Sequence, residues 1–172
     1  MKILEEIKKE HDEVRDLMLQ LENDEKKAEE IFSEMAVTIL AHHEAEEEVV
    51  FEKLPDEKEA QDLKMELISE HDSLRRSIQA VLDTDPDDDY WMPRYKVMKE
   101  IFWHHIQEEE GELFEKLRDA LSEKQLEKLY EPFESAEEKK KEEMKKKVDS
   151  KMVLKPEKDL PNVGVESMDG EP

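Results

Sequence analysis

Apolar residues recur at spacings of three and four positions over long parts of the chain, and this pattern limits the fold more than any other feature. It covers residues 2–21, 24–53, 56–82 and 93–117. In the first stretch Ile3, Ile7 and Val14 share one helical face. The chain has only three Gly and is rich in Glu, Lys and Leu, which favour helix. We therefore predict an all-α protein.

Short links separate the four predicted helices. Pro55 ends the second one, since proline disfavours helix at the residue before it, and the acidic loop DTDPDDD precedes the fourth. Short links between long amphipathic helices favour antiparallel neighbours, so we expect an up-down-up-down four-helix bundle. A short fifth helix should start at Ser122, whose side chain and that of Gln125 suit a capping box, and Pro132 should interrupt it.

Charge divides the chain near Ser135. Residues 135–172 contain 10 acids and 9 bases, so residues 1–134 hold nearly all of the net charge of −23. We predict that residues 1–134 form the folded domain. Residues 135–172 should form a charged helical extension, in which Ser135 and Glu138 suit a capping box, followed by a tail with too few apolar residues to fold.

The composition also excludes several classes of function. A net charge of −23 would repel nucleic-acid phosphates, so we expect no nucleic-acid partner. No apolar run approaches the ~18 residues of a membrane span, and no signal sequence is evident. The chain has no Cys, which excludes disulfides and thiolate ligands. These features fit a cytoplasmic protein.

The six histidines all lie in two pairs of matching motifs. EHDEVR starts at Glu10 and EHDSLR at Glu70, while HHEAEEEVVFEKL starts at His42 and HHIQEEEGELFEKL at His104. Each half of the chain therefore carries the same two motifs on successive predicted helices. Two such halves can pack about a pseudo-twofold axis, which would bring their polar groups together at the centre of the bundle.

Helical phase selects the inward residues of the two HH motifs. Side chains at i and i+4 share a face, and alignment of the halves superposes the pair His42/Glu46 on the pair His105/Glu109. Both pairs continue the apolar stripes of their helices. The adjacent pairs are expected to flank the site, although the sequence leaves them open as alternatives. They are His43/Glu47 and His104/Glu108.

His11 and His71 also continue apolar stripes, which places one inward histidine on each of the four helices. A single histidine in such a stripe is more often a hydrogen-bonded core residue than a ligand. Several buried imidazoles and carboxylates without a metal would leave polar groups unpaired, at about 1–3 kcal/mol each. Imidazole and carboxylate together are common ligands of transition metals, so we predict a metal centre.

With these residues in this order, the chain resembles the hemerythrin-like family, also called the HHE cation-binding domain, over about residues 3–120. The resemblance implies a metal-binding domain over residues 1–134 with two non-haem iron ions, bridged by oxo and carboxylate groups. It implies terminal ligands at His11, His42, His71 and His105, and bridging ligands at Glu46 and Glu109. The resemblance also implies that the protein binds or senses small ligands such as oxygen or nitric oxide, or that it stores iron.

One departure concerns oxygen carriage, because oxygen-carrying members have a second histidine one turn after the histidine of the third helix. Arg75 occupies that position here. The chain also lacks the Cys-bearing N-terminal segment of members that repair iron centres.

Two other interpretations remain open. In the first, the chain is an acidic helical interaction module that holds a structural zinc or manganese ion and binds a protein partner through its tail. In the second, it is a ferritin-like carboxylate enzyme. The enzyme interpretation is weak because that class uses Glu-x-x-His, which does not occur here. No general base separate from the predicted ligands is evident, so the sequence leaves enzymatic activity undecided.

Overall fold

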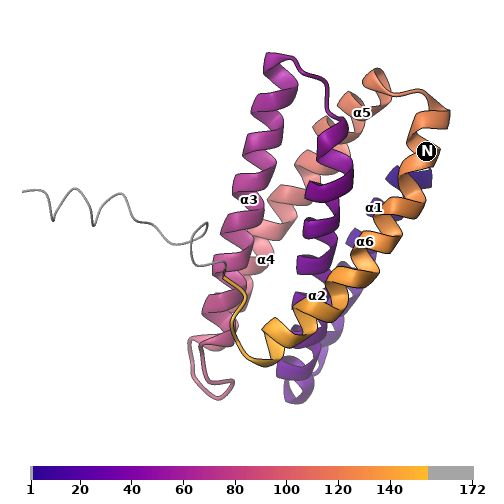
Figure 1. Cartoon of the computed structure of the whole chain (residues 1–172). Helices are drawn as coiled ribbons and strands as arrows, with labels where there is room; N and C mark the ends of the chain where they lie inside the picture. The colour runs from indigo at the N-terminus through magenta and orange to yellow at the C-terminus, as the bar shows by residue number, and fades with distance from the viewer. Residues whose placement is uncertain (1, 155–172) are drawn as a thin grey trace, which may run out of the picture.

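The computed structural model describes residues 2–154, and these residues form helices joined by short links, with no β-strand among them (Figure 1). The α-helices are α1 (Lys2–Asn23), α2 (Ala28–Ala45), α3 (Lys58–Leu82), α4 (Trp91–Glu108), α5 (Phe114–Ala120) and α6 (Glu123–Asp149). The prediction of an all-α fold is confirmed. None of these helices combines the length and the apolar character that a membrane crossing requires.

Shorter segments with a different winding interrupt the predicted second and fourth helices. Two of them are 3₁₀ turns, η1 (Glu25–Lys27) and η3 (Phe51–Lys53). The other two are π-helical, η2 (Glu46–Val50), which follows α2 directly, and η4 (Glu109–Leu113), which joins α4 to α5. The two π-helical segments lie at matching positions of the sequence repeat.

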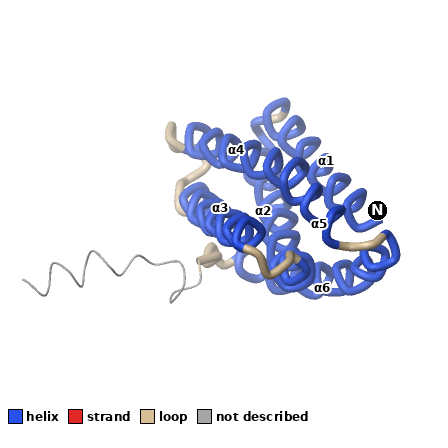
Figure 2. Tube along the Cα trace, turned by 90° about the horizontal axis from the view of Figure 1, so that it is seen from above, coloured by secondary structure: helices blue, strands red, loops and turns tan. Residues whose placement is uncertain are grey.

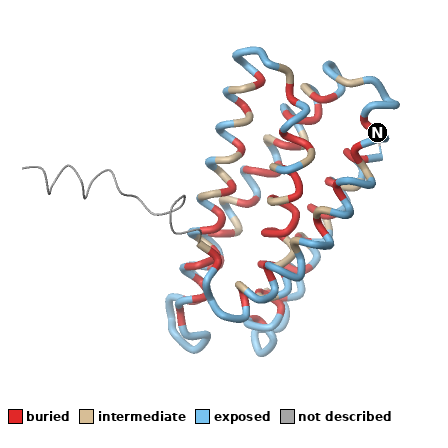
Figure 3. Tube along the Cα trace, viewed as in Figure 1, coloured by how far each residue is buried: buried red, intermediate tan, exposed pale blue. Residues whose placement is uncertain are grey.

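The helices pack as a bundle in which α1 contacts α2, α3 contacts α4, and α6 lies against α1 and α2 (Figure 2). Buried residues face the interior of the bundle and exposed ones face outward (Figure 3). The buried apolar side chains form two clusters, one containing Val14, Ile39 and Ile78, the other Ile7 and Leu67. Along each of α1, α2 and α3, the buried histidines lie between these clusters.

The predicted short fifth helix is wrong in its length. Ser122 caps α6 through a capping box with Gln125, as predicted, but the helix continues to Asp149 and contains Pro132. A proline inside a helix removes one hydrogen bond and costs about 3 kcal/mol. Burial of Leu129 and Phe133 on either side of it offsets that cost.

The expected boundary at Ser135 does not interrupt the helix. Ser135 lies inside α6, so it caps nothing, and the same helix carries Met144 and Val148 into the apolar core. Val153 is buried after the helix ends, and its backbone N–H donates to Gln79 Oε1 at 2.8 Å. Scattered apolar residues at helical spacing were therefore enough to dock this segment. The tail expected to be disordered lies, from residue 155 onward, outside the described residues.

Candidate metal centre

A layer of buried polar side chains crosses the bundle between the two apolar clusters. It contains every residue predicted as a ligand, and each is at most 3% exposed: His11, His42, Glu46, His71, His105 and Glu109. These side chains come from α1, α2, α3, α4 and the first residues of the two π-helical segments. The structure thus brings together residues that lie up to 98 positions apart in the sequence.

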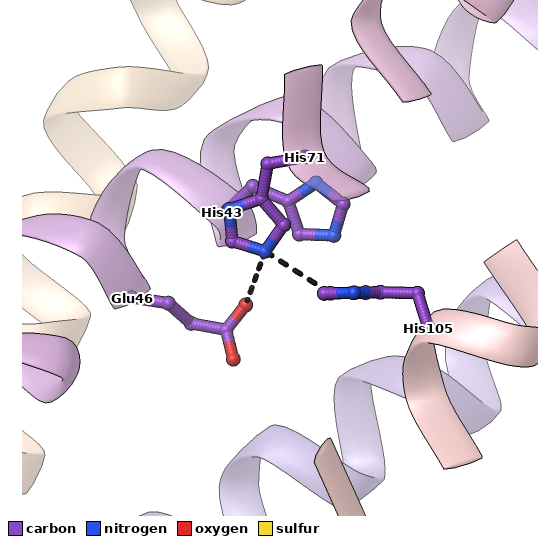
Figure 4. A group of neighbouring side chains, drawn as sticks. All are labelled: His43, Glu46, His71 and His105. Atoms are coloured by element: carbon purple, nitrogen blue, oxygen red, sulfur yellow. Dashed lines mark hydrogen bonds and ion pairs between the residues drawn. The ribbon is translucent and has the colours of Figure 1, made fainter. Parts of the chain in front are cut away.

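The candidate ligands of the layer form two groups. Within each group, the potential ligand atoms all lie within 4.8 Å of one another. One group is His43, Glu46, His71 and His105, shown in Figure 4, and the other is His11, His42 and Glu109. In the first group, His71 Nε2 lies 3.0 Å from His105 Nε2. Each group has the nitrogen and oxygen donors that one transition-metal ion prefers.

The carboxylates of Glu46 and Glu109 lie between the two groups. Glu46 Oε1 is 3.2 Å from His42 Nε2 and 3.7 Å from His71 Nε2. Glu109 Oε1 is 3.2 Å from both His11 Nε2 and His105 Nε2. Each carboxylate therefore reaches a histidine of both groups, which is the placement that a bridging carboxylate needs.

A second set of carboxylates faces the outer nitrogen of the four histidines. The Nδ1–H of each ring donates to a glutamate of a neighbouring helix: His42 to Glu10 at 2.6 Å, His71 to Glu47 at 2.9 Å, His105 to Glu70 at 2.7 Å and His11 to Glu110 at 2.8 Å. Such an outer hydrogen bond fixes the tautomer and the orientation of a metal-binding histidine, and leaves Nε2 as the donor atom. All four Nε2 atoms accordingly face the centre of the layer.

These four links form a closed ring around the bundle. A glutamate of α1 accepts from the histidine of α2, and a glutamate of η2, which continues α2, accepts from the histidine of α3. In the same way, a glutamate of α3 accepts from the histidine of α4, and a glutamate of η4, which continues α4, accepts from the histidine of α1. We call this arrangement the carboxylate ring. It explains why both motifs begin as they do, since the glutamate before His11 and the one before His71 each orient a histidine on the following helix.

Two arginines extend the carboxylate ring outward. Arg15 lies 3.6 Å from Glu110 and also pairs with Asp12, while Arg75 lies 3.8 Å from Glu47 and pairs with Asp72. Each residue type of the EHDxxR motif therefore has a place at the centre. Its His is a candidate ligand, its Glu accepts a hydrogen bond from the histidine of the next helix, and its Arg lies near a glutamate of the carboxylate ring. Arg75 is almost completely buried. It occupies the position where oxygen carriers place an additional histidine.

Burial and neighbouring charges shift the pKa of three histidines of the layer. Burial lowers the pKa of His71 to about 4, so this ring is neutral at neutral pH. Burial also acts on His105, but the negative charge of Glu109 and the hydrogen bonds to Glu109 and Glu70 together outweigh it and raise the pKa to about 10. For His42, burial is likewise outweighed by the charge of Glu46 together with hydrogen bonds to neighbouring glutamates, and the pKa lies well above its usual value.

The pKa values of Glu46 and Glu109 are shifted in opposite directions. Burial and the nearby charge of Glu109 raise the pKa of Glu46 well above its usual value. Burial would raise that of Glu109 too, but the adjacent His105 lowers it well below the usual range. Perturbed pKa values of this kind cluster at functional sites. Positive ions at the centre would replace the protons that now balance these charges.

Several buried polar atoms of the layer fit a metal ion better than they fit a core of hydrogen bonds. Within residues 2–154, no hydrogen bond is made by either ring nitrogen of His43, by Glu46 Oε2 or by Glu109 Oε2. An unpaired buried polar group costs about 1–3 kcal/mol. Coordination of a cation by these atoms would remove that cost, so the donor set of this layer fits a metal centre of the kind that the resemblance implies.

The two HH motifs place their adjacent histidines differently. On α4, His105 is inside and His104 is 66% exposed. On α2 both are buried, because His42 faces α1 and α6 whereas the ring of His43 stacks on that of His71 with 3.8 Å between centroids. The expectation of one inward pair per helix therefore fails on α2. Buried Leu40 and Ala36, three and seven positions before His43, are the sequence signal that could have revealed it.

Comparison with known proteins agrees with this geometry. A model of the hemerythrin HHE cation-binding domain matches residues 2–117, and the chain belongs to that family. A DNA nickase of Nostoc sp. (strain PCC 7120) is 29% identical over 141 residues, which cover 81% of this chain. The chain spans only 40% of that relative's length. No solved structure matches the chain significantly.

Proposed function

We propose that this protein binds a pair of non-haem iron ions at the centre of its bundle. The proposal takes α1 to α4 as an up-down-up-down bundle. It assigns His11 and His42 to one ion, His71 and His105 to the other, and Glu46 and Glu109 to positions between them. His43 would add a nitrogen donor on the side of His71 and His105.

The observation that carries the proposal is the orientation of the four histidines. Each is held at Nδ1 by a carboxylate from another part of the bundle, and each presents Nε2 to one of two buried carboxylates, Glu46 or Glu109. A core that had only to be stable would not need this arrangement, since apolar residues of similar volume serve as well. Bound iron would supply redox chemistry toward small ligands, so binding or sensing of oxygen or nitric oxide, or iron storage, is the function that we favour.

Metal analysis combined with absorption spectra tests the proposal. Protein purified from iron-supplemented cells should contain about two iron ions per chain and show near-ultraviolet bands after aerobic oxidation that disappear on reduction. Two zinc or manganese ions in place of iron would favour the alternative of a structural metal. Background metal content after reconstitution with each of these ions would contradict the proposal.

The name of the Nostoc relative suggests a second candidate function, DNA cleavage. Two-metal centres can hydrolyse phosphodiesters, and this chain has buried carboxylates and histidines for two metals. The net charge of −23 opposes binding of DNA by this chain alone. Relaxation of supercoiled plasmid by the metal-loaded protein, lost in the His105→Ala variant, would support cleavage, and no relaxation would exclude it.

A further inference from the structure

Helix α6 reaches the candidate metal centre from outside the family domain. The domain match ends at residue 117, whereas α6 starts at Glu123 and lies along α1 and α2 (Figure 1). Its side chain Phe133 packs edge-on against the ring of His42, with 5.7 Å between centroids. One turn further, Glu137 is buried and its Oε2 lies 3.8 Å from His42 Nδ1.

His42 therefore has two carboxylates at its outer nitrogen. Glu10 accepts the hydrogen bond at 2.6 Å, and Glu137 lies beside Glu10 with its other oxygen 3.8 Å from Lys141 Nζ. Both carboxylates are less than 10% exposed, although buried acids are rare unless they are paired.

In the other half of the repeat, the second carboxylate comes from the same helix as the histidine. His105 donates to Glu70, and the groups next to Glu70 are Glu108, whose side chain is 18% exposed, and His104, which is 66% exposed, both from α4. In the described part of the chain, no helix covers this side as α6 covers the side of His42. His43 already distinguishes the inner ligands of the two halves, and α6 adds a second difference in the shell around them.

We propose that α6 belongs to the metal centre and that Glu137 is a positioning residue, which acts through Glu10 and His42 and makes the metal position at His11 and His42 different from the one at His71 and His105. This inference rests on the proposed function. A second negative charge behind His42 orients the ring and strengthens it as a donor, as outer carboxylates do for metal-binding histidines.

Titration of the full chain with Co²⁺ under identical conditions tests the inference. The wild type should show two binding events. In Glu137→Gln one of them should weaken by about 10- to 100-fold, the range found for outer-shell partners, and the other should stay unchanged. The control is Glu138→Gln, which removes the same charge from an exposed position one residue away and should behave as the wild type.

Double variants identify the route of the effect. Because Glu137 is proposed to act through Glu10, the loss caused by Glu137→Gln should shrink when Glu10 is already Gln, and it should add to the loss caused by Glu70→Gln on the other half. Glu137→Met, which fills a similar volume without a charge, serves as a second variant if Glu137→Gln does not fold. It should weaken the same binding event.

The outcomes separate the two proposals. A wild-type chain that binds no Co²⁺ would overturn the proposed function. Two wild-type binding events that both survive unchanged in Glu137→Gln and Glu137→Met would overturn the inference alone. An equal loss at both positions, together with a lower melting temperature of the metal-free protein, would show that Glu137 only stabilises the fold and would overturn the inference too.

Discussion

At the scale of single residues, two adjacent histidines on α4 lie in opposite environments. His105 is buried and directs Nε2 toward Glu109 at 3.2 Å, whereas His104 is 66% exposed. We predict that His105→Ala loses at least one of the two metal ions per chain and that His104→Ala keeps both. Metal analysis of the two purified variants makes the comparison. Equal metal loss in the two variants would mean that the surface histidine also binds.

Protonation provides a second prediction at this scale. His105, with its pKa raised to about 10 against an ordinary value near 6.5, holds a proton in the metal-free protein at neutral pH. A metal binds the neutral ring, so loading must release that proton. The affinity for the metal should therefore rise with pH until the pH reaches about 10, the pKa of His105.

Calorimetric titrations in two buffers with different heats of ionisation measure the protons released. We expect a net release at pH 7.5, and a smaller one for His105→Ala. The same proton stabilises the metal-free fold, fully below about pH 6.5 and no longer above about pH 10. Binding heats that are the same in both buffers would contradict ligation by a histidine that must first release its proton.

At the scale of elements, the two π-helical segments begin with the two candidate bridging carboxylates. Glu46 opens η2 and Glu109 opens η4, and π-helical turns occur frequently at functional sites. Gly111 lies in η4, but the matching residue of η2 is Glu48, so the winding does not require glycine. A Cβ added at Gly111 would meet no atom within 4 Å.

We predict that Gly111→Ala stabilises the protein by about 0.5–1 kcal/mol, because alanine loses less backbone entropy on folding. Urea unfolding of the metal-free protein measures this gain, and metal content should not change. Loss of a metal ion in this variant would instead show that η4 depends on the flexibility of glycine.

Helix α6 should contribute strongly to stability. Phe133 is fully buried between the core and His42, so Phe133→Ala is expected to cost about 3–5 kcal/mol. Its exposed neighbour provides the control, since Glu134→Ala should stay within about 0.5 kcal/mol. Both free energies of unfolding come from urea titrations. A small effect of Phe133→Ala would indicate that α6 docks only weakly.

The sequence predicted much of this arrangement, because periodicity and repetition are local signals. The phase of His105 followed from its apolar stripe, and the cap at Ser122 from its neighbour Gln125. The burial of His43 was not predicted, although the apolar residues Leu40 and Ala36 lie on its face of α2. Two adjacent residues can both be buried only if the helix is covered on more than one side, and this depends on the long-range docking of α6.

The length of α6 was missed for a related reason. Pro132 and the capping box suited to Ser135 and Glu138 indicate locally that one helix ends here and another begins. Only the contacts of Phe133, Met144 and Val148 with the rest of the core outweigh these signals. Glu137 was missed with it. Tertiary packing decided both cases, and a single sequence does not reveal which distant surface will cover a weakly amphipathic segment.

At the scale of the whole molecule, the bundle carries a layer of buried polar atoms that metal ions would satisfy. Ligands that bind only the folded state stabilise it, by about 2.7 kcal/mol at a concentration 100 times the Kd. We therefore predict that iron raises the melting temperature and that a chelator reverses the gain. Thermal unfolding followed by circular dichroism measures both steps. The double variant His42→Ala with His105→Ala should show no gain.

The carboxylate ring has a direction, since every link runs from a glutamate toward the histidine of the next helix. Two of its links join helices within one half of the repeat, and two join the halves to each other. A twofold rotation exchanges the members of each pair without reversing that direction. Two separate copies of a single helical hairpin could therefore close the same ring as a symmetric dimer. The present chain has the form that such a hairpin would take after duplication and fusion, with α6 added to one side only.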